Sequence, residues 1–192
     1  MAGTHKGKPI KAPSGQTLRP TSDRAREAIF NSLCHGNSKI GIGDHVTNSW
    51  VLDGFSGTGA MAFEALSRGA KYATCLDSNK ISIECCRTNA SSLGFSKNLT
   101  ITQCDVLSPP VSNKPCCLIF LDPPYFKDLI EKSLISLATT GWIQDKALCI
   151  TETAQKEKIQ WPPSFRLLDQ RKYGKSLITF LRFTDRVSEE SS

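Results

Sequence analysis

The fold is decided by residues 50–60, which read Trp50-Val51-Leu52-Asp53-Gly54-Phe55-Ser56-Gly57-Thr58-Gly59-Ala60. The first four predict a short apolar strand that ends in an acid. The glycines that follow let the backbone turn sharply and approach a ligand closely. A helix predicted over 61–67 then presents free N–H groups in its first turn. This order of strand, glycine-rich turn and helix is typical of the first unit of a nucleotide-binding α/β domain.

Strands and helices continue to alternate on either side of this stretch. An upstream helix that Thr21 or Ser22 can cap has an apolar face made of Ala25, Ile29, Phe30 and Leu33. Residues 36–48 are expected to form a loop. Further helices are predicted at 81–93 and 129–138, and strands at 72–76, 99–103, 116–121, 147–151, 165–168 and 177–183. The alternation predicts an α/β fold with a mostly parallel sheet.

Four acids lie at or just after the predicted strand ends, namely Asp53, Asp77, Asp105 and Asp122. Parallel sheets bind ligands at the carboxyl ends of their strands. The sequence therefore predicts one polar site along a single edge of the sheet.

Two cofactors are compatible with the glycine-rich turn. The spacing Gly57-x-Gly59-x-x-Ala62 loosely matches a dinucleotide-binding pattern, with Asp77 placed to bind ribose hydroxyls. S-adenosylmethionine (AdoMet) sites use a similar turn but place an acid before the glycines, as Asp53 does here. AdoMet carries an ammonium and a sulfonium, whereas an acid would repel a pyrophosphate. We therefore favour AdoMet, and Asp105 would suit its adenine amino group.

The run Asp122-Pro123-Pro124-Tyr125 predicts the chemistry. Two prolines fix the backbone after a buried strand and hold Asp122 extended. An exocyclic amine of a nucleobase is a poor nucleophile, and acceptors such as the Asp122 carboxylate and the Pro123 carbonyl can localise its lone pair. Tyr125 can stack on the base, which must be unpaired or flipped out to reach the pocket.

The eight cysteines are interpreted as reduced core thiols of a cytoplasmic protein. None are spaced Cys-x-x-Cys, and the three histidines form no ligand pattern with them, so we expect no metal site. Pro115-Cys116 resembles the nucleophile motif of cytosine-C5 methyltransferases. However, Cys116 lies at the start of its strand, opposite the active edge, and we discount it.

The formal net charge of +6 is concentrated at the two ends of the 192 residues. Residues 1–26 carry +5, residues 27–165 carry −1 and residues 166–186 carry +4. Such clustering is compatible with a solvated surface or with a polyanion-binding one. No apolar run approaches the ~20 residues of a membrane span, and we expect no membrane partner.

The segment 18–31, LRPTSDRAREAIFN, together with the two site motifs, closely resembles the RsmD family of bacterial methyltransferases. Residues 64–70 and Tyr173-Gly174 also fit that family. The resemblance implies a class I methyltransferase fold, Rossmann-like and seven-stranded, with helices on both faces and a reversed last strand. It implies transfer of a methyl group from AdoMet to the N2 of a guanosine in 16S ribosomal RNA, within a partly or fully assembled small subunit.

The resemblance also implies residue roles and boundaries. A basic arm and helix (1–35) would lie beside the active site of a methyltransferase domain (36–186), followed by a disordered tail (187–192) in a monomeric protein. The catalytic motif would be residues 122–125, and the RNA would contact Lys8, Arg19, Thr21, Arg24 and Arg26. AdoMet would contact Asp53, Phe55, Ser56, Gly57, Thr58, Gly59, Asp77 and Asp105.

Several alternatives stay open from the residues alone. Adenine-N6 methyltransferases of RNA or DNA share the Asp-Pro-Pro-Tyr motif. A protein-glutamine methyltransferase would favour Asn at position 122 and leaves the basic arm unexplained. A non-catalytic module that binds AdoMet or RNA is a further possibility, and a dinucleotide oxidoreductase explains neither Asp53 nor residues 122–125.

Overall fold

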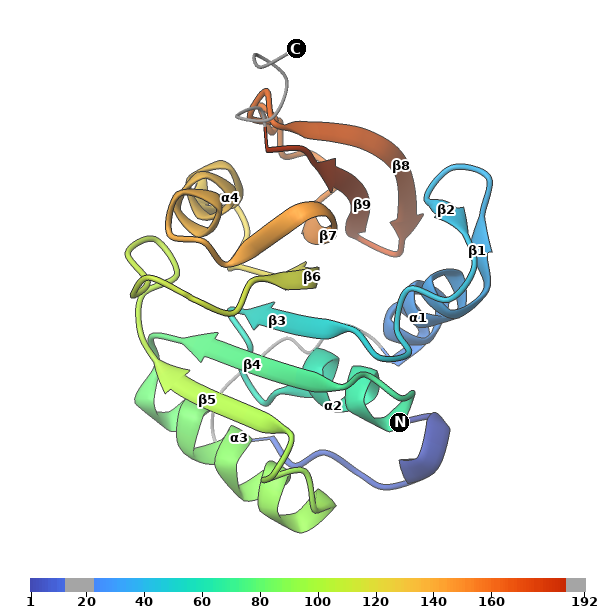
Figure 1. Ribbon diagram of the computed structural model, residues 1–192, viewed down its shortest axis with the longest axis vertical. Coiled ribbons are helices and arrows are strands. Elements are labelled where there is room, and N and C mark those ends of the chain that lie inside the picture. Colours follow the sequence, from blue (N-terminus) through green and yellow to red (C-terminus); the bar gives the residue numbers. More distant parts are fainter. Residues whose placement is uncertain (13–22, 186–192) are drawn as a thin grey trace.

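The chain, described here by a computed structural model, is defined for residues 1–12 and 23–185, except for the side chain of Asp23. Its main sheet has seven strands in the order β5-β4-β3-β6-β7-β9-β8. Figure 1 shows this sheet running through the molecule. The strands are β3 (Trp50–Gly54), β4 (Tyr72–Asp77), β5 (Leu99–Gln103), β6 (Cys116–Leu121), β7 (Ile143–Ala154), β8 (Phe165–Tyr173) and β9 (Ser176–Phe183).

The first five of these strands pair in parallel, and only β9 runs against its neighbours β7 and β8. The last strand is therefore reversed and inserted beside β7. The predicted class I methyltransferase architecture, with a seven-stranded mostly parallel sheet, is confirmed.

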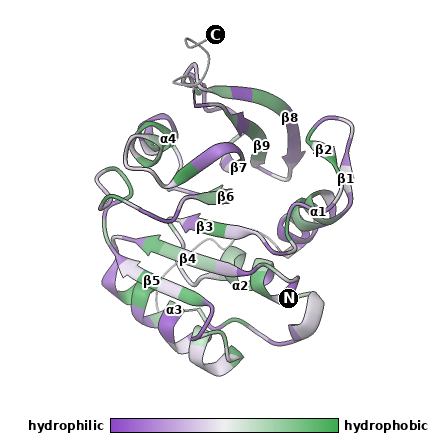
Figure 2. Cartoon of the chain, viewed as in Figure 1, coloured by the Kyte–Doolittle hydropathy of each residue, from purple (hydrophilic) through white to green (hydrophobic). Residues whose placement is uncertain are grey.

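Helices cover both faces of the sheet, as predicted. On one face, α1 (Asp23–His35), α2 (Ala60–Ser67) and α3 (Lys80–Leu93) pack in one apolar cluster with alternate residues of the strands. On the other face, α4 (Leu129–Thr139) packs in a second cluster. Figure 2 shows α3 banded in green and purple, the pattern of a helix with one buried and one exposed side.

The strand order places the ends of β3 and β6 side by side. From β3 the chain builds outward to β4 and β5 on one side, and then crosses back to β6 and β7 on the other. The switch point between the two halves lies between β3 and β6, and ligands of open α/β sheets bind there. Asp53 and the residues after Leu121 flank it, because Gly54 pairs with Leu121 in the register.

The largest differences from the sequence expectations concern the segment 36–48 and the lengths of β7 and β8. The expected loop at 36–48 contains a short antiparallel pair, β1 (Gly36–Asn37) and β2 (Gly41–Ile42). Strand β7 begins at Ile143, four residues before its predicted start, and ends at Ala154, three residues after its predicted end, and β8 runs on to Tyr173. The added residues are mostly polar, and pairing with neighbouring strands makes them part of the sheet where an apolar pattern alone gives no signal.

The first residues of the chain are packed against helices. A 3-10 turn, η1 (Gly3–His5), leads the chain across α2 and α3. The His5 amide donates to Ser67 Oγ at 2.9 Å, and the Lys11 amide donates to Asn89 Oδ1 at 3.0 Å. Residues 1–12 therefore belong to the same body as the sheet. In the described part of the chain, no helix is long and apolar enough to cross a membrane.

Candidate functional site

Asp53 is the most deeply buried acid of the predicted site, with 4% of its surface exposed. Its Oδ2 accepts a hydrogen bond of 3.0 Å from the amide of Ala62, in the first turn of α2. Burial raises the pKa of this carboxyl well above its usual range, and the nearby charges of Asp122 and Asp77 raise it further. Asp53 thus joins the end of β3 to the start of α2 and is electrostatically coupled to Asp77 and Asp122.

The glycine-rich turn adopts conformations that most residues avoid. Phe55, Gly57 and Gly59 all have positive φ, at 61°, 52° and 83°. A Cβ on Gly59 would lie 2.6 Å from the ring of Phe63 and 2.7 Å from Cys86 Sγ, so the turn packs tightly against α2 and α3. A Cβ on Gly57 would meet nothing within 4 Å. The turn is therefore closed at Gly59 and open at Gly57, where a ligand can approach the backbone.

Asp77 holds the open part of the turn in place. Its Oδ2 accepts from the amide of Gly57 at 2.8 Å, and its Oδ1 accepts from the amide of Asn79 at 2.8 Å. Ser56 is buried in the same turn, and the carbonyl of Thr58 accepts from Asn89 Nδ2 at 3.2 Å. The turn therefore connects the ends of β3 and β4. Through Asn89 it is also linked to Lys11, in the first segment of the chain.

Asp105 lies just beyond the end of β5 and is exposed. Its Oδ1 accepts from the amide of Leu107 at 2.9 Å, which shapes a local turn. The structure thus places the three acids that were predicted to contact the cofactor along one edge of the sheet, in the order β5, β4, β3.

The Asp122–Tyr125 motif follows β6 directly, on the other side of the switch point from Asp53. Asp122 is half-buried and electrostatically coupled to Asp53 and to Tyr125. The Tyr125 hydroxyl donates to Glu152 Oε1 at 2.9 Å and lies 2.9 Å from Ser176 Oγ. Burial, with the Glu152 charge also contributing, raises the pKa of Tyr125 to about 12, so the phenol stays protonated and donates.

Two glutamates of this site were missed by the sequence analysis. Glu152 lies near the end of β7 and is 7% exposed. Glu157 accepts from the amides of Phe126 and Ala154, each at 2.6 Å, and so fastens the loop after β6 to the end of β7. Glu152 directly follows the predicted strand at 147–151, so the rule that selected the four aspartates would also have found it.

The predicted RNA-binding residues have different surroundings. Lys8 and Arg24 are exposed. The Arg26 side chain is only 9% exposed, and its Nε lies 3.8 Å from Glu64 Oε2, an arrangement that argues against a direct phosphate contact. Arg19 and Thr21, like the possible caps of α1, lie outside the described residues.

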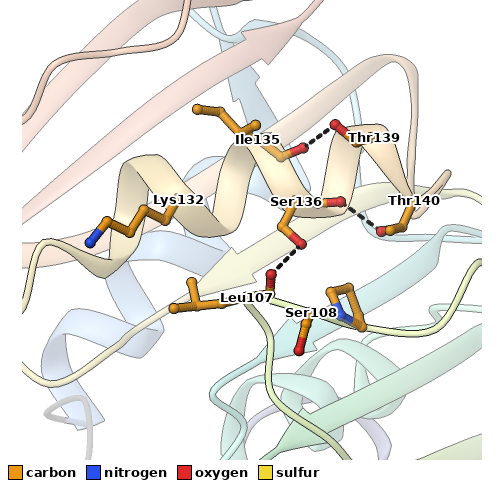
Figure 3. A pocket seen from close by; sticks show the side chains of 8 residues that line it. Leu107, Ser108, Lys132, Ile135, Ser136, Thr139 and Thr140 are labelled. Carbon is orange, nitrogen blue, oxygen red and sulfur yellow. Dashed lines mark hydrogen bonds between the residues drawn. The ribbon is translucent and has the colours of Figure 1, made fainter.

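Other chemical groups of the described residues do not compete with this site. They form no cluster of His, Cys, Asp and Glu able to hold a metal ion. Cys116 is buried at the start of β6, and burial raises its pKa to about 12, which suppresses the thiolate. A hollow between α4 and the segment after β5 is lined by residues including Leu107, Lys132 and Ser136 (Figure 3). It is on the α4 face, whereas Asp53 bonds to α2 on the opposite face.

Comparison with known proteins identifies the family of this chain. Residues 1–182 match the family model described as conserved hypothetical protein 95, the RsmD family. The chain belongs to this family. An RsmD-family relative, the ribosomal RNA small subunit methyltransferase D of Haemophilus influenzae, is 30% identical over 91% of this chain and 88% of its own.

Solved structures agree with this assignment. The yhhF protein of Escherichia coli has a TM-score of 0.79 and 26% identity, with 96% of each chain covered. An RNA methyltransferase from Salinibacter ruber, solved with S-adenosyl-L-homocysteine, has a TM-score of 0.66 over 91% of this chain and 99% of its own. At 12% identity, that second likeness supports the fold alone.

Proposed function

We propose that this RsmD-family protein transfers a methyl group from AdoMet to the exocyclic N2 of a guanosine in 16S ribosomal RNA. The observation that carries the proposal is the placement of Asp53 and of the Asp122–Tyr125 motif on the two sides of one switch point. A cofactor bound at the first would face a base bound at the second. The Haemophilus influenzae relative, named for methylation of small-subunit RNA, supports the substrate class.

The residues around the turn fit AdoMet. The backbone is open at Gly57, and three carboxylates, Asp53, Asp77 and Asp105, lie on the neighbouring strand ends. Acidic groups complement the ammonium and sulfonium of AdoMet and oppose a pyrophosphate, and a cation bound beside Asp53 would favour its ionised form. Asp53 would face the amino-acid part, Asp77 the ribose and Asp105 the adenine. AdoMet, when bound, supplies an electrophilic methyl group.

The chain contributes positioning and charge stabilisation. The Asp122 carboxylate and the Pro123 carbonyl accept hydrogen bonds from the two N2 hydrogens, which concentrates the nitrogen lone pair toward the methyl group. As N2 takes up the methyl group, its proton would leave toward the Asp122 carboxylate. Tyr125 stacks on the base, an interaction worth ~1–3 kcal/mol. Holding the two reactants in line supplies the remaining acceleration.

The RNA backbone would meet the basic surface beside the site. Exposed Lys8 and Arg24, with Arg19 and Thr21 of the arm, are the proposed contacts. The substrate would be the RNA of a partly or fully assembled small subunit in the bacterial cytoplasm, and the protein would act as a monomer.

Transfer of a tritiated methyl group from AdoMet to small subunits that lack the modification tests the proposal. Nucleoside analysis should find N2-methylguanosine, and Asp122→Ala should abolish it. Asp145→Ala, which removes an exposed carboxylate near the start of β7, is the matched control and should keep wild-type activity. N6-methyladenosine as the product would refute the substrate, and wild-type turnover by Asp122→Ala would refute the mechanism. Calorimetry with NAD in place of AdoMet should show no binding.

A further inference from the structure

Glu152 stands level with Asp122 on the neighbouring strand. Leu121 pairs with Thr151 in the parallel register of β6 and β7, so the next residue of each chain segment lies at the same height. Phe120 and Ile150 both pack in the cluster on the α1–α3 face. Because side chains alternate along a strand, Asp122 and Glu152 are directed to that same face. Two carboxylates therefore lie side by side where the target base is proposed to bind.

The two oxygens of Glu152 have unequal surroundings. Oε1 accepts from the Tyr125 hydroxyl at 2.9 Å and from Ser176 Oγ at 2.6 Å. Oε2 is buried and has no hydrogen-bond partner among the described residues. Buried carboxylate oxygens are nearly always hydrogen-bonded, because an unpaired one loses its hydration without compensation. Because Glu152 Oε2 lies in the part of the site proposed to bind the base, a hydrogen-bond donor of the base would satisfy it.

Guanine supplies that donor and adenine does not. Beside its N2 amine, guanine carries an N1–H on the same edge, so the edge presents adjacent donors. Adenine presents an acceptor at N1 beside its exocyclic amine. Two neighbouring carboxylates complement the first edge, whereas the second would bring the N1 lone pair against a carboxylate.

We propose that Glu152 is the residue that selects guanine, with Oε2 accepting the N1–H of the base while Asp122 accepts from its N2 amine. The inference rests on the proposed function and adds to it the determinant of base identity. Tyr125 and Ser176 occupy Oε1 and so fix the rotation of the carboxylate. Tyr125 thereby couples the stacking ring to the group that reads the base edge.

A comparison of two bases with two enzymes tests this role. A small-subunit RNA is prepared with either guanosine or 2-aminopurine at the mapped target, since 2-aminopurine keeps the 2-amine but lacks the N1–H. Wild-type kcat/KM should be higher for guanosine. Glu152→Gln can turn an amide donor toward the bare N1 of 2-aminopurine. It should reduce the guanosine preference by about 10- to 100-fold, the value of one hydrogen bond to a charged group.

Because 2-aminopurine also lacks O6, the diagnostic quantity is the change in preference between enzymes. Tyr125→Phe and Ser176→Ala are the matched controls, because they remove donors to Oε1 and leave Oε2 in place. Both should keep the guanosine preference even where the rate falls. AdoMet affinity by calorimetry confirms that each variant is folded.

Equal loss on both RNAs by Glu152→Gln would overturn the proposal and leave Glu152 as a support for Tyr125 alone. A wild-type enzyme that does not discriminate between the bases would also overturn it. Failure of the proposed function looks different, because the wild type would then form no N2-methylguanosine at all.

Discussion

The glycine-rich turn offers a quantitative test, because its two central glycines are constrained for different reasons. At Gly59, φ is +83°, which costs an L-residue ~1–2 kcal/mol. An added Cβ would also lie 2.6 Å from Phe63 and 2.7 Å from Cys86 Sγ, and both side chains are fully buried. Overpacking of this kind costs ~1–3 kcal/mol. Gly59→Ala should therefore lower the free energy of unfolding by about 2–5 kcal/mol.

Gly57→Ala tests the side of the turn that we expect to face the ligand, separately from its packing against the helices. Its φ is +52° and its Cβ would meet nothing within 4 Å, so only backbone strain of ~1–2 kcal/mol applies. The new methyl group would stand where we place AdoMet, and AdoMet affinity should fall while most of the stability is kept. Gly94→Ala is the control for strain alone, because Gly94 has φ +78° with open space around it, at the end of α3 far along the chain from the turn.

Thermal denaturation and calorimetry separate these effects. A change of 1 kcal/mol shifts Tm by ~2–4 °C in a chain of this size. We expect a fall of about 4–20 °C for Gly59→Ala, and of about 2–8 °C for Gly57→Ala and Gly94→Ala. Only Gly57→Ala should weaken AdoMet binding without a matching loss of stability. If Gly59→Ala proved as stable as Gly94→Ala, the tight packing of the turn against α2 and α3 would be refuted.

Two further predictions concern charged groups. The pKa of Asp53 is raised in the fold, so its stabilising contribution is present below its unfolded pKa near 3.8 and is lost as the pH rises through the folded value. Asp53→Asn should therefore flatten the stability–pH curve in that window and lose AdoMet affinity; an unchanged dependence of stability on pH would contradict this. Arg24→Ala should reduce the slope of log affinity for RNA against log salt by ~0.7–0.9, whereas Arg26→Ala should mainly lower Tm. Equal changes in salt slope would show that Arg26 also meets phosphate.

Much of the fold could be predicted because its strands are short apolar runs bounded by glycine, proline or acids. Leu99–Gln103 and Cys116–Leu121 have the predicted bounds for that reason. The aspartates could be located because a charged side chain directly after an apolar run marks the end of a strand. The polar start of β7 and the pair β1–β2 carry no such signal, since they are strands only through their neighbours.

The roles of the remaining site residues are set by contacts between segments that are distant in the sequence. Whether an arginine on α1 faces solvent or a carboxylate is decided by Glu64, which lies 38 residues after Arg26 in the chain. The role of Glu152 likewise depends on Tyr125 and Ser176, which come from different strand ends. Helical periodicity and strand pattern describe one segment at a time, so neither can reveal such pairings.

Glu64 determines how α1 lies against α2. Arg26 and Arg68 both pair with its carboxylate, which also accepts from the amide of Ala2. Arg68 in turn donates to Asn31, one and a half turns further along α1 than Arg26, so α1 and α2 run in the same direction. Their N-termini therefore point toward the same edge of the sheet. Removing one partner of a buried ion pair leaves an uncompensated charge, so the pairs at Glu64 hold α1 against α2 in this orientation.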